Sequence, residues 1–409
     1  MKILNFASCN IDFVYSLDHI VAPGETETSS DFNVFPGGKG LNQSIAIARA
    51  GGYVYHAGCV GNDGEILLET LKKSGVDVSY VRAVDIKNGH AIIQVSSKGE
   101  NSIFLFAGSN ECVSREMVDE ILLDFGAGDM LLLQNEISNV DYIIKKAYEK
   151  NICIVFNPSP FNDKLKDIDY NMISYVMVNE VEARGISGCN EPEQALAVLN
   201  ERYPELKVVL TLGKNGSVFF DGESKVYQPA YKVEVKDTTA AGDTFTGYFV
   251  SEIAKGSGYK QAMQIASAAS AIAVSRMGAS SSIPTYCEVE NALKGFQKNR
   301  SDGANQRKER KIVEYIEQNL KEADINELSE ILGYSHVYTS SLVKKLSGKT
   351  FSELLKAKRC ASAARMLLET DLPISEIISE IGYENQSFFR KMFKQTYGET
   401  PLQYRKNRS

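Results

Sequence analysis

Residues 237–245 read DTTAAGDTF, in which small residues run into an aspartate at the start of a predicted helix. Ala240, Ala241 and Gly242 carry little or no side chain, so their backbone N–H groups can approach a phosphate or an oxyanion closely. Asp243 would lie within reach of that anion, where it could take the proton of a hydroxyl that attacks a γ-phosphate. This pattern predicts alcohol phosphorylation by general-base catalysis, and an ordinary Asp-capped helix is the alternative.

Residues 36–43 read PGGKGLNQ and lead into SIAIARAGG, a glycine turn that opens a helix of small side chains. Gly37 and Gly38 could bring backbone amides against sugar hydroxyls, and Lys39 and Asn42 would supply directional donors. Taken alone, this motif could be a helix-opening turn. Together with Asp243 it favours a sugar as the alcohol.

The two motifs resemble those of the PfkB carbohydrate kinases, in their ribokinase-like form, over about residues 1–290. The resemblance implies that Asp243 is the catalytic base and that Ala240, Ala241 and Gly242 form the anion hole. Asn157, in an NPSP segment, matches a further family position. The sugar-binding positions that the resemblance implies are Asn10, Asp12, Gly37, Gly38, Lys39, Asn42, Glu136 and Asp243.

A nucleotide and a divalent metal are also implied by the resemblance. Asn179 and Glu182, in MVNEVEA, match an N-x-x-E motif that organises Mg²⁺ and its water around ATP, and Mg²⁺ needs few protein oxygens. The run TLGKNG, residues 211–216, matches a nucleotide-binding loop, although a hairpin turn is its simpler interpretation. The implied ATP contacts are Asn179, Thr211, Gly213, Gly216 and Ser267. No Walker-type or dinucleotide-binding glycine motif occurs in the chain.

A monovalent cation is the third ligand that the resemblance implies. Carbonyl and hydroxyl oxygens suit a large, weakly hydrated ion, and a helix that stops at Gly278 is the alternative. The residues that align with a K⁺ site are Asp237, Thr239, Ala273, Arg276, Gly278 and Ser282.

Short apolar runs alternate with amphipathic stretches through the first 290 residues, as in MLLLQ followed by YIIKKAYEK. This alternation predicts a doubly wound α/β sheet, with ligands beyond the carboxyl ends of its strands. The segments GHAIIQVSS and NSIFLFAG, joined by KGE, predict an antiparallel hairpin. The resemblance implies that such strands form a small β lid over the sugar and a homodimer surface.

The remainder of the chain differs in composition. Residues 301–409 carry 18 Lys and Arg against 15 Asp and Glu, whereas residues 1–300 carry 27 against 37. We predict a kinase domain at 1–296, a polar linker at 297–307 and an all-α domain at 308–409. The all-α domain contains two helix-turn-helix patterns, around INELSEILGYSHVYTSSLVKKLSG and ISEIISEIGYENQSFFRKMFKQTYG.

The second pattern ends in GETPLQYRK and resembles the AraC-type transcriptional regulators over about residues 308–406. This resemblance implies a double helix-turn-helix that binds double-stranded DNA, although a helical interaction domain is the alternative from charge alone. The implied base-reading residues are Val337, Ser340, Ser341, Gln386, Arg390 and Lys391, and Lys344 and Lys394 would contact phosphates or remain solvated.

The seven cysteines show no metal spacing, and no signal peptide or membrane-spanning run is evident, so we expect a cytoplasmic protein with no membrane partner. We predict an ATP-dependent sugar kinase, with ribose favoured, fused to a DNA-binding regulator. Two alternatives remain open: a transcription factor whose kinase fold only senses ligand, and a kinase of another sugar or nucleoside. Ligand binding would change DNA binding only if the two states bind the ligand unequally.

Overall fold

The computed structural model describes residues 1–408, and for residues 297–306 it describes the backbone alone. Two compact units divide the chain, Met1–Gly295 and Phe296–Ser409. Among the described residues, no helix is both long enough and apolar enough to cross a membrane.

The first unit is built on a nine-stranded sheet in the order β13-β12-β11-β10-β9-β8-β1-β4-β5. Neighbouring strands are parallel from β11 to β5, and only β12 runs against the others. The strands are β1 (Ile3–Phe6), β4 (Val54–Val60), β5 (Asp77–Ala83), β8 (Met130–Gln134), β9 (Cys153–Asn157), β10 (Tyr175–Asn179), β11 (Lys207–Thr211), β12 (Ser217–Phe220) and β13 (Lys225–Gln228).

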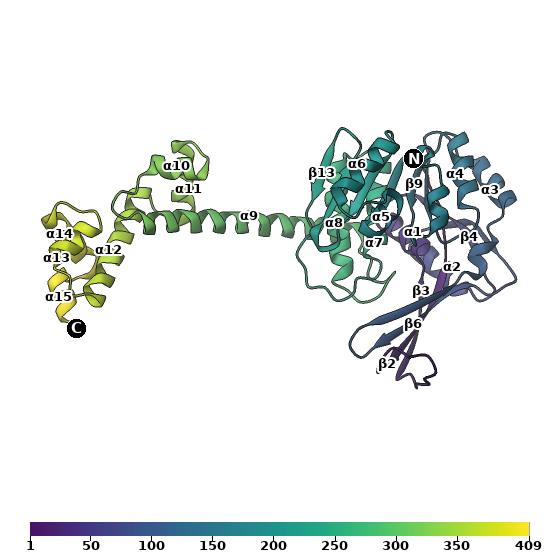
Figure 1. The fold of residues 1–409 in the computed structure, drawn as a ribbon, viewed down its shortest axis with the longest axis horizontal. Helices are drawn as coiled ribbons and strands as arrows, with labels where there is room; N and C mark the ends of the chain where they lie inside the picture. Colours follow the sequence, from purple (N-terminus) through teal and green to yellow (C-terminus); the bar gives the residue numbers. More distant parts are fainter. Residues whose placement is uncertain (409) are drawn as a thin grey trace. The chain divides into compact units, whose positions relative to one another are not determined.

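Helices cover both faces of this sheet, which confirms the predicted doubly wound fold (Figure 1). The apolar sides of α3 (Arg115–Ile121), α4 (Val140–Glu149), α5 (Glu180–Ser187) and α6 (Pro192–Arg202) pack with alternate strand residues such as Leu4 and Phe6. Asn5 lies between those two residues and bonds to the opposite layer, which includes α1 (Lys39–Arg49), α7 (Ala241–Ala254) and α8 (Tyr259–Val274). The helix α2 (Glu65–Lys73) packs against β5.

A second sheet of four strands, in the order β3-β2-β6-β7, projects from the main sheet (Figure 1). Its strands are β2 (Asn10–Leu17), β3 (Asp31–Gly37), β6 (Gly89–Ser96) and β7 (Asn101–Phe106). The predicted hairpin is β6 and β7, which pair antiparallel, and β6 runs parallel to β2. We call these four strands the lid sheet.

The second unit is all helical and contains two small apolar cores. One core joins the end of α9 (Tyr286–Gln318) to α10 (Ile325–Leu332), α11 (His336–Ser347) and α12 (Phe351–Glu369). The other joins α12 to α13 (Ile374–Glu380), α14 (Gln386–Tyr397) and α15 (Pro401–Lys406). The pairs α10–α11 and α13–α14 each enclose a short turn whose glycine, Gly333 or Gly382, has positive φ.

The predicted linker, residues 297–307, has helical backbone within α9. Polar composition suggested a linker but gave no secondary structure, and a long charged stretch without Pro is compatible with a helix. The side chains of 297–306 lie outside the described part of the chain.

Candidate active site

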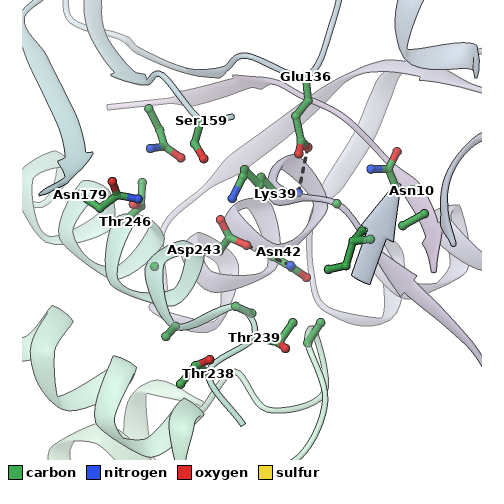
Figure 2. A pocket seen from close by; sticks show the side chains of 18 of the residues that line it. Asn10, Lys39, Asn42, Glu136, Ser159, Asn179, Thr238, Thr239, Asp243 and Thr246 are labelled. Carbon is green, nitrogen blue, oxygen red and sulfur yellow. Dashed lines mark hydrogen bonds between the residues drawn. The ribbon is translucent and has the colours of Figure 1, made fainter. Parts of the chain in front are cut away.

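A cleft of about 510 Å³ lies at the carboxyl ends of the central strands and extends beneath the lid sheet. It brings together residues that are far apart in the sequence, including Asn10, Asn42, Glu136, Asn179 and Asp243. Figure 2 shows Asp243 and Asn42 at its centre, with Glu136 and Asn10 on one side and Asn179 on the other.

Asp243 lies in the first turn of α7 and is buried. Its carboxylate accepts hydrogen bonds from Asn42 Nδ2 (3.1 Å, to Oδ2) and from Gln43 Nε2 (2.9 Å, to Oδ1). The residue at the N-cap is Ala240, and no side chain caps the helix. The ordinary Asp-capped helix is therefore not what forms, and Asp243 faces the cleft instead.

The start of α7 has the shape of an anion cradle. Ala240 adopts a left-handed backbone (φ 59°), and the first N–H groups of a helix have no partner within the helix; that of Ala241 makes a long hydrogen bond to Thr238 O (3.3 Å). A Cβ built on Gly242 would meet no atom within 4 Å, so the space above this turn is open. The backbone amides and the helix dipole at this point fit a phosphate group.

Gly37 and Gly38, which precede α1, leave space for the side chains of Asp12 and Asn10 on β2. A Cβ on Gly38 would lie 3.0 Å from Asn10 N, and Gly38 has a φ of 92°. Gly37 is similarly close to the side chain of Asp12 and does not line the cleft itself. Asn10 Oδ1 accepts a hydrogen bond from Asn110 Nδ2 (2.7 Å), which orients its amide.

Charged groups surround the middle of the cleft. Glu136 accepts hydrogen bonds from the backbone N–H of Lys39 (3.1 Å; dashed in Figure 2) and from Ser8 Oγ. Burial raises the pKa of Glu136, and it also raises the pKa of Asp12, to about 7, with a further contribution from Glu136. For Lys39 burial opposes the charge, but the carboxylates of Asp243, Glu136 and Glu182 outweigh it and raise its pKa.

One atom of the cleft wall lacks an internal partner. Asn42 donates to Asp243 through Nδ2, whereas its buried Oδ1 accepts no hydrogen bond from any residue that the structure describes. Because a buried amide oxygen without a partner is costly, this acceptor fits a ligand hydroxyl beside Asp243.

The N-x-x-E pair begins α5 at the end of β10. Asn179 Oδ1 accepts from the N–H groups of Val181 and Glu182, and Glu182 Oε2 accepts from Asn179 N, which forms a capping box. Both side chains still line the cleft, and Glu182 is buried there. A buried carboxylate near the anion cradle fits a role in holding Mg²⁺ through water.

The predicted ATP residues are only partly brought together. Asn179 and Thr211 line the cleft, whereas Gly213, Gly216 and Ser267 do not. The run TLGKNG connects β11 and β12, which pair antiparallel, so its local structure is the hairpin turn. Ser267 is buried within α8.

The proposed cation loop and the loop before α7 are in contact. Asp237 accepts from Thr239 N (2.8 Å), Thr239 Oγ1 (2.6 Å) and Gly278 N (3.0 Å). Partial burial opposes the charge of Asp237, but these hydrogen bonds outweigh it and lower its pKa. Ala273 and Ser282, which lie close to Gly278 in the sequence, are buried. The side chain of Arg276 pairs with Glu288 at 2.5 Å.

The predicted DNA-contacting residues lie on α11 and α14. Val337 is 78% exposed. The others are exposed, except Ser340, which is half-buried: they are Ser341 and Lys344 on α11 and Gln386, Arg390, Lys391 and Lys394 on α14. Each helix therefore exposes mainly polar residues, together with Val337 on α11 and Phe388 on α14, and buries residues such as Val343 and Phe389. An exposed face of this kind is what a recognition helix requires.

Comparison with known proteins agrees with this geometry. The pfkB family carbohydrate kinase model matches residues 1–286, and a helix-turn-helix domain model matches residues 328–407. The chain belongs to the pfkB family of carbohydrate kinases. It also carries an AraC-type helix-turn-helix domain at its C-terminal end.

Several relatives of this pfkB kinase are ribokinases. The ribokinase of Bacillus subtilis is 34% identical over 290 residues, which cover 70% of this chain and 97% of the relative. The ribokinase structure from Cryptococcus neoformans, in complex with ADP, has a TM-score of 0.64 and 34% identity and covers 71% of this chain and 99% of its own. The Arabidopsis thaliana ribokinase, complexed with ribose and ATP, has a TM-score of 0.63 and 28% identity over 72% and 98%.

Proposed function

We propose that the first unit transfers the γ-phosphate of ATP to the primary hydroxyl of a sugar, with ribose as the preferred substrate. The observation that supports it most is Asp243, held by two amides beside an open helix start. The aspartate would take the hydroxyl proton while the amides at Ala240, Ala241 and Gly242 stabilise the transferring phosphate.

We assign the sugar to Asn10, Asp12, Lys39, Asn42 and Glu136, which surround the cleft on the lid side of Asp243. Their carboxylates and amides can accept and donate several hydrogen bonds, as a polyhydroxylated substrate requires. Gly37 and Gly38 contribute by leaving space for Asp12 and Asn10. The similarity to ribokinases, one of them complexed with ribose and ATP, favours ribose over nucleosides as the substrate.

We assign Asn179 and Glu182 to Mg²⁺ and its water, and Thr211, Gly213, Gly216 and Ser267 to the nucleotide. Bound Mg²⁺ would neutralise charge on the ATP phosphates. We further assign K⁺ to the loops that contain Asp237, Thr239, Ala273, Arg276, Gly278 and Ser282.

ADP release on a panel of pentoses, hexoses and nucleosides tests the kinase proposal. We expect ribose to give the highest kcat/KM and Asp243→Asn to lower kcat by about 10²- to 10⁴-fold. Asp119→Asn, an exposed change on α3, is the matched control and should retain activity. If no sugar or nucleoside stimulates ADP release, the unit only senses ligand, and retention of the base is then unexplained.

We propose that the second unit binds specific double-stranded DNA and regulates sugar-utilisation genes. In this proposal residues 1–296 form the kinase domain, 297–307 the linker and 308–409 the DNA-binding domain. Its support is the pair of exposed helices α11 and α14. A mobility shift with DNA upstream of the gene should show a complex that weakens with salt. Arg390→Ala in the full chain should weaken it, whereas Arg365→Ala on α12 should not. Equal binding of random DNA would contradict the proposal.

We also propose a homodimer formed through the lid sheet. Ile103 and Leu105 of β7 line the cleft, whereas Phe104 and Phe106 alternate with them, and Phe104 is 56% exposed. Exposed aromatic residues on the far side of the strand fit a second copy of the chain. Light scattering should give a dimer for the wild type and a monomer for Phe104→Asp. A monomeric wild type would exclude this arrangement.

A further inference from the structure

Gln43 lies directly behind the catalytic base, outside the cleft. Its side chain is fully buried, and it is absent from the residues that line the cleft. The amide nitrogen donates to Asp243 Oδ1 (2.9 Å) and to Asn157 Oδ1 (3.0 Å). Both amide hydrogens of Gln43 are therefore used, one of them on the base.

The orientation of the Gln43 amide is determined from its other end. Gln43 Oε1 accepts a hydrogen bond from Gln134 Nε2 (2.7 Å). A flipped amide would place its oxygen against the Asp243 carboxylate and its nitrogen against the donor of Gln134. Because both contacts would then be repulsive in a buried site, only one orientation is stable.

The hydrogen bonds continue through the sheet in the opposite donor direction, because Gln134 donates both towards Gln43 and away from it. Gln134 Nε2 also donates to Asn5 Oδ1 (2.9 Å), and Asn5 Nδ2 donates to Ser44 Oγ (2.8 Å). Ser44 Oγ lies 2.8 Å from His56 Nδ1. Burial lowers the pKa of His56 to about 4, so the ring is neutral and can accept from Ser44 at Nδ1.

This chain of amides connects the base to β8 and β1, the central strands of the main sheet. We infer that Gln43 is a positioning residue that holds the plane of the Asp243 carboxylate for proton transfer. Asn42 performs part of the same task on Oδ2 but also faces the cleft, whereas Gln43 has no access to substrate. The inference rests on the proposed kinase reaction.

Two variants of Gln43 separate positioning from substrate binding. Gln43→Leu removes the donor to Oδ1, and we expect kcat to fall on the order of 100-fold with little change in the sugar KM. Gln43→Glu keeps the size but adds a second carboxylate. Because adjacent carboxylates resist ionising together, the acidic limb of the kcat–pH profile should move to higher pH by about one unit or more.

Gln134→Leu is an intermediate variant, since it removes the donor that orients the Gln43 amide but leaves the Gln43 donor beside Asp243. We expect it to lower the melting temperature and to lower kcat less than Gln43→Leu does, while the acidic limb does not move. A cooperative thermal unfolding transition, measured for each variant, establishes that the variant is folded.

The inference is overturned if folded Gln43→Leu keeps the wild-type kcat, or if Gln134→Leu moves the acidic limb as far as Gln43→Glu does. Should Gln43→Leu fail to fold, the pH profile of the size-matched Gln43→Glu decides alone, and an unmoved acidic limb overturns the inference. A wild-type protein without sugar-dependent ADP release would instead refute the kinase proposal.

Discussion

The side chain of Asp12 occupies the space that any side chain at Gly37 would need, since a Cβ there would lie 2.0 Å from Asp12 Oδ2. Asp12 and Gly37 belong to neighbouring strands of the lid sheet, β2 and β3, close to where they pair Asn10 with Gly37. The Asp12 carboxylate can therefore occupy this position only because residue 37 is a glycine.

Gly37→Ala should displace Asp12 and raise the sugar KM about tenfold, with a smaller effect on kcat. Overpacking of this kind also costs about 1–3 kcal/mol of stability. Gly126→Ala serves as control, because a Cβ there would meet no atom within 4 Å. Steady-state kinetics and thermal unfolding of both variants measure the effect, and equal sugar KM values in the two would contradict it.

The sugar KM should depend on pH through Asp12. Burial, and secondarily Glu136, raise the pKa of Asp12 from 3.8 to about 7. Below pH 7 the carboxylate takes up a proton and accepts fewer hydrogen bonds, so the sugar KM should rise by up to about tenfold per pH unit. Asp12→Asn should give a higher KM that varies little between pH 5.5 and 8.5.

Thermal unfolding provides a second measurement on Asp12. A raised pKa in the folded state means that stability is fully present below pH 3.8 and is lost as the pH rises through about 7. Asp12→Asn should therefore raise the melting temperature relative to wild type at pH 8, and this advantage should diminish towards pH 5. An equal difference at both pH values would show that Asp12 titrates normally.

Activation by a monovalent cation should depend on Asp237, which joins the loop before α7 to Gly278. We expect Asp237→Asn to require about tenfold more KCl for half-maximal turnover, because the hydrogen bond from Gly278 N to the carboxylate and the proposed oxygen ligand are both weakened. N-methylglucamine chloride keeps the ionic strength constant. If wild-type turnover is the same in KCl and in N-methylglucamine chloride, no cation acts at this site.

Base recognition by α11 should include an apolar contact through Val337, which is 78% exposed. The thymine methyl is the apolar group that the bases present in the major groove. For DNA selected from a random library, replacing one contacted thymine by uracil should weaken binding about fourfold. Val337→Ala should lose much of this sensitivity, and Arg390→Ala should keep it at lower overall affinity. Uracil tolerance in the wild type would contradict the contact.

The sequence predicted the doubly wound sheet, the lid hairpin and most of the cleft, because each strand end carries a polar residue that follows a buried apolar run. Asn10, Glu136 and Asn179 were identified by the resemblance to the PfkB kinases, and all three line the cleft. Gln43 ends the motif GGKGLNQ, but the motif does not predict a role for it, since only the fold reveals that it bonds to Asp243. Gln134, Asn110 and Ser8 were missed for the same reason: their partners are distant in sequence.

Other differences come from local backbone structure. The turn at 212–216 follows from β12 reversing direction beside β11, and strand pairing is not visible in a short glycine motif. Helical backbone through 297–307 was likewise not predicted, because charged residues are equally common in linkers and in exposed helices.

The residues 7–9 that separate β1 from β2 are the shortest path between the two sheets. Asn10 and Asp12 therefore belong to the lid sheet, whereas Asp243 and Asn42 lie on helices packed on the main sheet. A molecule that bonds to both pairs would connect the two sheets across this three-residue segment. Binding in the cleft would therefore restrict the lid sheet relative to the main sheet before any phosphate is transferred.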